Sequence, residues 1–317
     1  MKNKSLVMFV SSIMIAVFHL WVNTASVGST AYEIEEFIKY ICFAGVDMFF
    51  IVSAFSIAQS SASDYGGFIK KRFGKIYLKF LFFAIVASVV GSWSINRLLK
   101  VITGVELFER GGGSFLWFAP AILIVYLLLP LYKKVDVRYP RATPVIAVLI
   151  WFAIGLTLTR LGLARQIFIF YNRLPAVLVG FYLGKYDVLG RIRKSKAGYI
   201  AISLASLCVG VVLVYLWGYQ TVSNRPLYDF FYILGLPLAV GLVMILDALP
   251  EIEIARRLGR CTFEMYGLQM IFGFKAADII YKTFGSAALS NVVTIALLMF
   301  AAAVLERVFG RLQEILN

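Results

Sequence analysis

The chain is a series of apolar runs separated by short polar breaks. Ten runs of 18 to 23 residues are each long enough for a helix to cross a bilayer, which takes about 20 residues. Runs such as AILIVYLLLP do not alternate between apolar and polar positions, so the pattern predicts helices rather than a β-barrel. The predicted spans are 5–22, 37–59, 76–96, 115–132, 143–160, 167–184, 197–217, 227–249, 263–281 and 287–306.

The composition supports a bilayer as the solvent of this chain. Hydrophobic residues make up 61% of its 317 residues, charged residues only 15%, and the mean hydropathy is +0.85. A soluble domain has about a quarter of its residues charged. We therefore predict an all-α polytopic membrane protein, a single transmembrane domain over residues 1–317 with no cleaved signal peptide. The expected location is a cell membrane.

The basic residues give the orientation. When the breaks between runs are assigned alternately to two sides, one side receives twenty Lys and Arg residues and the other receives seven. Because short cytoplasmic loops are enriched in Lys and Arg, both termini are predicted to be cytoplasmic. The same asymmetry accounts for the net charge of +14, so a nucleic-acid-binding role is not needed to explain it. The sequence also contains no nucleic-acid-binding motif.

Polar residues inside the spans are the candidates for chemistry, because they are costly to bury in a bilayer. His19 is the only histidine of the chain and lies near the outer end of the first run. Asp47 lies in the outer half of the second run, within GVDMFFIVSAFSIA. If these two helices form an antiparallel hairpin, the carboxylate lies at a depth comparable to the imidazole and can orient it as a base. A structural hydrogen bond of His19, and an arginine partner for Asp47, are the alternatives.

No metal site is predicted. Cys42, Cys208 and Cys261 are scattered in or beside the apolar runs without metal-ligand spacing, which is typical of buried apolar thiols.

Five segments stand out along the chain: FHLW, GVDMFFIVSAFSI, FIKKRFGKIYLKF, FLWFAPAILIVYLLLPLY and NRLPAVLVGFYLGKY. In order and spacing they resemble the acyltransferase-3 family of membrane acyltransferases. The resemblance covers nearly the whole chain, and its second-span motif is specific. It implies ten helices and transfer of an acyl group, usually acetyl, from cytoplasmic acyl-CoA to a hydroxyl of a cell-surface polysaccharide or glycolipid. Acyl-CoA is then a co-substrate, and no bound cofactor is expected. The location that the resemblance implies is the plasma or inner membrane of a bacterial cell.

The resemblance also implies roles for individual residues. His19 stands at the position of the family's catalytic histidine, and Asp47 at its Gly-Val-Asp aspartate. The basic cluster after the second span is suited to the phosphates of CoA, although such clusters also serve as topology signals. Its members are Lys70, Lys71, Arg72 and Lys75. Residues expected to contribute to substrate binding are Ser53, Trp117, Arg173, Glu264 and Gln269.

Two positions depart from the family pattern. Met8 occupies a position where the family usually has an arginine, and Gln269 stands where a second histidine is often found. Both departures favour two alternative functions, a transporter of a lipid-linked sugar or acyl group and an inactive scaffold. A transporter predicts paired interrupted helices related by an internal repeat, and the sequence shows no such repeat. Acyl transfer by His19, with Asp47 orienting the ring, is the preferred hypothesis; an acyl-histidine intermediate is its variant.

Overall fold

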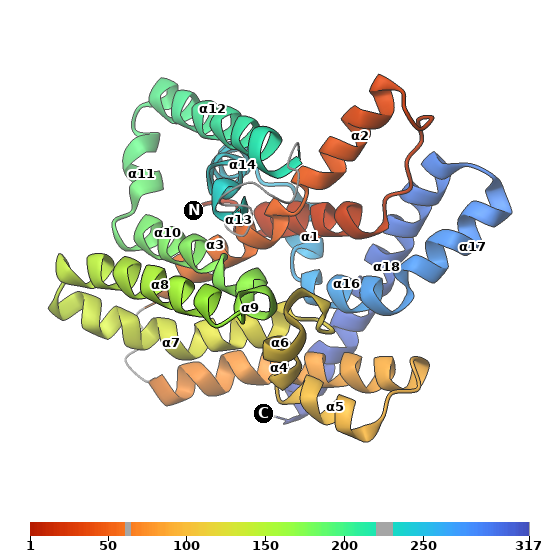
Figure 1. Cartoon of the computed structure of the whole chain (residues 1–317), viewed down its shortest axis with the longest axis horizontal. Helices are drawn as coiled ribbons and strands as arrows, with labels where there is room; N and C mark the ends of the chain where they lie inside the picture. Colours follow the sequence, from red (N-terminus) through yellow and green to blue (C-terminus); the bar gives the residue numbers. More distant parts are fainter. Residues whose placement is uncertain (61–64, 220–230, 317) are drawn as a thin grey trace. The chain divides into compact units, whose positions relative to one another are not determined.

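The computed structural model describes residues 1–60, 65–219 and 231–316, and these residues form helices and short connections without any strand. The chain divides into two compact units. Unit 1 comprises Met1–Val52 and Asp187–Asn317, and unit 2 comprises Ser53–Tyr186. Figure 1 shows their helices, and each unit is described by itself.

Six helices within the described residues are long and apolar enough to span a membrane. Two shorter apolar helices, Lys4–Leu20 and Leu236–Ala248, coincide with further predicted spans. The all-helical, multi-pass prediction is therefore confirmed, whereas the number of ten spans and the side of the termini stay predictions. The six helices are Thr30–Gln59, Tyr65–Val90, Phe118–Arg138, Ala142–Arg160, Lys196–Trp217 and Ala287–Leu312.

Unit 1 combines the N-terminal helices of the chain with the helices that follow Tyr186 (Figure 1). Helix α3 (Ala44–Gln59) begins in unit 1 and continues into unit 2 at Ser53. The other elements of unit 1 are α1 (Lys4–Leu20), α2 (Thr30–Ile41), α11 (Val188–Arg193), α12 (Lys196–Leu213), π-helical η2 (Val214–Tyr219), α13 (Phe231–Leu234), α14 (Leu236–Ala248), α15 (Glu253–Leu258), α16 (Thr262–Leu268), π-helical η4 (Gln269–Gly273), α17 (Phe274–Phe284) and α18 (Ala287–Leu316).

Glycines set the close approach of helices in unit 1. Gly210 of α12 lies against the backbone of Leu238, and Gly241 of α14 lies so close to α12 that a Cβ would be 2.6 Å from the backbone nitrogen of Leu207. Without a large hydrophobic driving force between helices in lipid, such small residues let two backbones pack tightly.

Glycine contacts of the same kind fix the position of α1 among its neighbours. Gly259 packs against the Ser5 carbonyl, and a Cβ on Gly273 would lie 2.8 Å from Leu20 Cδ1. Helix α1 therefore runs parallel to the chain from α15 to η4, in a fixed register. On its other side, a Cβ on Gly45 would lie 2.7 Å from the Ser11 carbonyl oxygen.

Unit 2 contains the basic helix after the second predicted span and a group of side-by-side helices (Figure 1). Lys133 of α7 donates to the carbonyls of Ala58 and Ser60, at 2.8 and 2.6 Å, and so caps the end of α3. The elements of unit 2 are α4 (Tyr65–Val90), α5 (Ile95–Ile102), α6 (Val105–Arg110), η1 (Gly111–Gly113), α7 (Phe118–Arg138), α8 (Ala142–Arg160), α9 (Ala164–Tyr171) and α10 (Leu174–Lys185).

Some predicted boundaries are wrong. Helix α4 begins at Tyr65 rather than at residue 76, so the basic cluster lies on its first turns and not in a loop. The predicted span 167–184 is two helices, α9 and α10, separated at Asn172 and Arg173, because Pro175 in the first turn of α10 cannot continue a hydrogen-bonded helix from α9. Residues 227–230 of the predicted span 227–249 lie outside the described residues.

Candidate active site in unit 1

His19 lies in the last turn of α1, and its side chain is half-buried. The Phe18 ring contacts the imidazole edge-on, with ring centroids 5.2 Å apart. One face of α1 meets Gly45, and the opposite face carries Leu20, which meets Gly273. Each residue of an α-helix is rotated by about 100° from the one before it, so His19 lies on the side of α1 between these two faces. No hydrogen bond of the imidazole occurs within the described residues, so its two nitrogens are available to a substrate.

Gln269 is a buried amide whose hydrogen bonds are not made. The side chain is 1% exposed, and within the described part of the chain neither its oxygen nor its nitrogen has a hydrogen-bond partner. Burying an unpartnered amide costs about 1–3 kcal/mol in proteins, so this residue does not stabilise the fold. It is the first residue of η4, and π-helical turns occur often at functional sites.

Thr294 on α18 is the second such group. Its side chain is 1% exposed, and Oγ1 has no hydrogen-bond partner among the described residues. The preceding turn of α18 is well satisfied: Asn291 accepts from the Val22 amide at 2.8 Å and donates to the Val22 carbonyl at 2.7 Å. Asn291 therefore holds α18 at the end of α1, with Thr294 about one turn deeper.

The register places these three residues within about one helical turn of each other along the axis of α1. Helices α1, η4 and α18 contact one another pairwise. Gly273 is level with Leu20, so Gln269 lies about one helical turn below His19 on the face of η4 that meets α1. Asn291 is bonded to Val22, just after the end of α1, and Thr294 lies about one turn deeper on α18. Thr294 is therefore near the level of His19. We call His19, Gln269 and Thr294 the polar layer.

Asp47 and Glu264 are buried at another level, with exposed fractions of 1% and 0%. Glu35 accepts from the Thr24 amide at 2.9 Å, and Gly45 lies against Ser11. The chain from α2 to α3 therefore runs antiparallel to α1, which places Asp47 about eight residues, or ~12 Å of helix rise, from the level of His19. The register from Gly259 places Glu264 near the same deeper level. A direct contact between His19 and Asp47 stays a prediction.

The other predicted substrate residues belong to unit 2. Arg173 is 2% exposed and lies at the joint between α9 and α10. Trp117 is buried and immediately precedes α7, and its ring meets Phe118 edge-on, with centroids 6.2 Å apart. Ser53, the first residue of unit 2, is half-buried within α3. Their predicted roles in acceptor binding stay predictions.

The basic cluster of α4 is not uniform. Lys70, Lys71 and Lys75 are exposed. Arg72 is half-buried, and its guanidinium lies 5.6 Å from the ring centroids of both Phe68 and Tyr126. Stacking on aromatic rings restrains a guanidinium and leaves its N–H donors free at the edge of its plane, so Arg72 is the most restrained side chain of the four.

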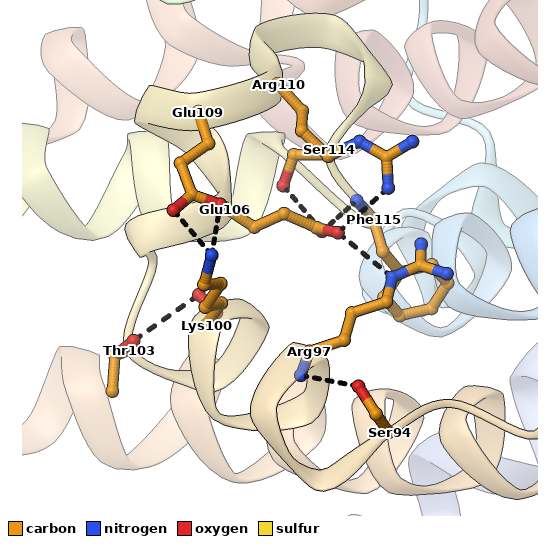
Figure 2. A network of polar contacts seen from close by, with 9 residues as sticks. All are labelled: Ser94, Arg97, Lys100, Thr103, Glu106, Glu109, Arg110, Ser114 and Phe115. Carbon is orange, nitrogen blue, oxygen red and sulfur yellow. Dashed lines mark hydrogen bonds and ion pairs between the residues drawn. The ribbon is translucent and has the colours of Figure 1, made fainter.

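Sequence reasoning missed three buried carboxylates. Figure 2 shows Glu106, which accepts from the Phe115 amide at 3.0 Å and pairs with Arg97 at 3.1 Å. Asp136 pairs with Lys185 and accepts from the Tyr182 hydroxyl at 2.8 Å. All of these contacts lie within unit 2 and satisfy the carboxylates.

Asp247 is the third buried carboxylate and belongs to unit 1. It accepts from the backbone amides of Lys2 and Asn3, at 2.5 and 2.8 Å, and pairs with Arg193. The start of α1 is thereby fixed to the end of α14. A short spacing between acid and base could have suggested the Glu106 cluster, whereas no local signal points to Asp247 or to Thr294.

The fold and the polar layer together define a helical membrane protein with a buried polar site. Residues 7–306 match the model of a family described as an acyltransferase domain, and the chain therefore belongs to the acyltransferase-3 family. This match confirms the resemblance noted in the sequence and shows a membrane acyltransferase in general terms. No curated protein and no solved structure matches the chain.

Proposed function

We propose that the protein transfers an acyl group, most simply acetyl, from cytoplasmic acyl-CoA to a hydroxyl of a cell-surface polysaccharide or glycolipid. The observation that carries this proposal, beyond the family, is the unpartnered amide of Gln269 one turn from His19. Sites that bind a reacting substrate keep hydrogen-bonding groups unsatisfied until the substrate arrives.

In this mechanism His19 is the general base. Neutral His19 takes the proton from the sugar hydroxyl as its oxygen forms a bond to the thioester carbonyl carbon. The tetrahedral intermediate then collapses, the carbon–sulfur bond breaks, and the imidazolium returns the proton to the CoA thiolate. The products are the sugar ester, free CoA and neutral His19. Asp47 stabilises the imidazolium through the field of its buried charge.

Gln269 supplies a hydrogen-bond donor for the thioester carbonyl oxygen as this oxygen gains negative charge. Its amide N–H₂ donates to this oxygen in the tetrahedral intermediate, and the hydroxyl of Thr294 binds the acceptor sugar at the same level. A donor of this kind is typically worth 10²- to 10³-fold in kcat. In this chain an amide does the work for which the family often uses a second histidine, without carrying a proton.

The remaining residues hold the two substrates. Arg72, with the three lysines of its cluster, binds the phosphates of CoA, because the restrained guanidinium matches phosphate geometry. Arg173 and Glu264, both buried, contribute to recognition of the acceptor, together with Ser53 and Trp117. Acyl-CoA is a co-substrate in this proposal, and the location is the plasma membrane of a bacterial cell.

The test of the proposal is transfer from radiolabelled acetyl-CoA to surface glycan by purified protein in lipid nanodiscs. His19→Ala should lower kcat roughly 10²- to 10⁴-fold while acetyl-CoA still binds, and His19→Gln should remove the acidic limb of the pH–rate profile. Ile13→Leu, on α1 but more than one turn from His19, is the matched control and should retain activity. A well-folded His19→Ala protein that transfers acetyl at the wild-type rate would exclude this mechanism.

A transporter is the second candidate, favoured by one observation. The sixth predicted span is interrupted at Arg173 between α9 and α10, and the ninth contains the π-helical turn η4, which begins at Gln269. Interrupted helices with buried polar groups are typical of transporter binding sites. Uptake of a labelled acyl donor into sealed vesicles, without formation of an ester or free CoA, would favour transport over transfer.

A further inference from the structure

Unit 2 contains an apolar groove that the proposed transfer does not use. Its volume is about 720 Å³, within the usual range of ligand sites, and α7, α8 and the α9–α10 segment form its walls. Lining residues on both long walls remain accessible: Leu128 of α7 exposes 59% of its surface and Ile150 of α8 exposes 54%. Because α7 and α8 are both candidate membrane spans, the groove opens where hydrocarbon is the solvent.

The chemistry of the lining excludes a polar occupant. Most of the lining side chains are aliphatic, and four of the five that carry a polar atom already use it. Thr143 donates to the Tyr139 carbonyl at 2.7 Å, the Trp151 indole donates to the Tyr171 carbonyl at 3.2 Å, and the Tyr132 and Tyr182 hydroxyls are 2.7 Å apart. Tyr171 in turn donates to the Trp151 carbonyl. A sugar or a nucleotide would bury its own hydroxyls without partners here.

One end of the groove is positively charged. Helix α7 ends and α8 begins with exposed Lys134, Arg138 and Arg141, and none of them pairs with a carboxylate within the described residues. The only acid nearby in the sequence, Asp136, is buried and already paired with Lys185. Tyr139 lies between the two arginines and lines the groove, so the apolar wall and the basic end are continuous.

We propose that this groove binds one acidic phospholipid of the bilayer, with its acyl chains along α7 and α8 and its phosphate at Arg138 and Arg141. The charge of the groove end selects an anionic headgroup, and the apolar lining accepts hydrocarbon chains. The lipid stabilises the packing of α8, whose long apolar face otherwise has few protein neighbours in unit 2: its membrane window is only 11% buried. This site is independent of the transfer reaction.

The experiment is native mass spectrometry of the full-length protein in detergent, titrated with phosphatidylglycerol or with phosphatidylcholine of the same chains. One phosphatidylglycerol should bind per chain, at least tenfold more tightly than phosphatidylcholine. Ala147→Trp fills the groove and should abolish binding, whereas Ala201→Trp on exposed α12 should not. Arg138→Gln with Arg141→Gln should weaken binding roughly tenfold to thirtyfold; Lys194→Gln with Lys196→Gln is the control pair.

A measurement without substitutions guards against a variant that fails to fold. Phosphatidylglycerol with a diazirine in its acyl chain should crosslink to peptides of α7 and α8 in the wild-type protein. Equal affinity for both lipids, crosslinks only to unit 1, or unchanged binding by a folded Ala147→Trp protein would each overturn the proposal. Recovery of an isoprenoid phosphate or a long-chain acyl-CoA as the bound molecule would also overturn it.

Discussion

Glu106 of unit 2 and Gln269 of unit 1 are buried to nearly the same extent, 2% and 1% exposed, yet their surroundings differ completely. The Glu106 carboxylate has two arginines, the Ser114 hydroxyl and the Phe115 amide as partners (Figure 2). The Gln269 amide has none among the described residues. A satisfied buried polar group holds structure together, whereas an unsatisfied one lowers stability and is expected where a ligand completes it.

The partners also come from different distances in the sequence. Every partner of Glu106 lies within nine residues of it, so the cluster closes one local loop. The surroundings of Gln269 are formed by α1 and α18, which lie far from it in the sequence. Asp247 resembles Glu106 in having a satisfied carboxylate, and it resembles Gln269 in being surrounded by residues distant in the sequence.

The largest effect on stability is expected for Asp247→Ala. Removal of the carboxylate leaves the Lys2 and Asn3 amides and the Arg193 guanidinium without their partner, so the free energy of unfolding should fall by about 3–5 kcal/mol. Thermal unfolding in detergent, followed by tryptophan fluorescence, measures the change. Asp247→Asn, which keeps one acceptor oxygen, should lose less. A loss below about 1 kcal/mol would show that satisfied clusters do not carry stability here.

Gln269→Leu should give the opposite combination. The substitution removes an unpartnered amide, so the free energy of unfolding should stay the same or rise by up to about 1 kcal/mol. Acetyl transfer should fall 10²- to 10³-fold if the amide donates to the developing oxyanion. Unfolding and transfer are measured on the same preparation, with Met270→Leu as the neighbouring control. A large loss of stability would mean that Gln269 has a structural partner after all.

Glu106→Gln should have a smaller effect than loss of Asp247. The amide keeps an acceptor for the Phe115 N–H but loses the charge that pairs with Arg97 and Arg110, both of which water can reach. The free energy of unfolding should fall by about 1–3 kcal/mol. Glu109→Gln is the matched control: Glu109 pairs with Lys100 at the surface, and its loss should change stability by less than about 1 kcal/mol. Equal losses for the two variants would contradict the importance of burial.

The smallest effect is expected at Glu253 on α15. Hydrogen bonds from Arg256 and Arg257 lower the pKa of this fully exposed carboxyl from 4.5 to about 2. Because the pKa of Glu253 is lower in the folded protein than in the unfolded chain, its ionised form stabilises the fold above pH 4.5. This contribution is lost as the pH falls toward 2. Water screens the group, so Glu253→Gln should be indistinguishable from wild type in thermal unfolding at pH 7, and any small difference should vanish only as the pH approaches 2. A clear destabilisation at pH 7 would show that exposed clusters of this protein behave like buried ones.

The sequence was sufficient for the class of the protein and for its family. Ten apolar runs predicted helices in a bilayer, and six candidate spans and an all-helical structure agree with this. The motifs around His19 and Asp47 indicated the acyltransferase-3 family, and the family match over residues 7–306 confirms it. Helix starts were less predictable, because α4 continues through a basic segment that hydropathy assigns to a loop.

The candidate site could be predicted only in part. His19 and Gln269 stood out in the sequence, one as the single histidine and one at a family position. Thr294 did not, because one threonine in an apolar helix is usually bonded to its own backbone, as Thr283 is to the Ile279 carbonyl at 2.8 Å. The level of Asp47 relative to His19 also depended on the packing of Gly45 against α1.

Hydrophobicity is a property of neighbouring residues, so the sequence by itself determined that the chain is helical and suited to a membrane. Which buried groups share a level depends on how helices slide against each other. That register is fixed by small residues: Gly45 and Gly259 let two backbones touch, and Gly273 leaves room for the Leu20 side chain. Tertiary structure alone decided that Glu106 and Asp247 are satisfied and that Gln269 is not, because a hydrogen bond needs two groups within about 3 Å, whatever their separation in sequence.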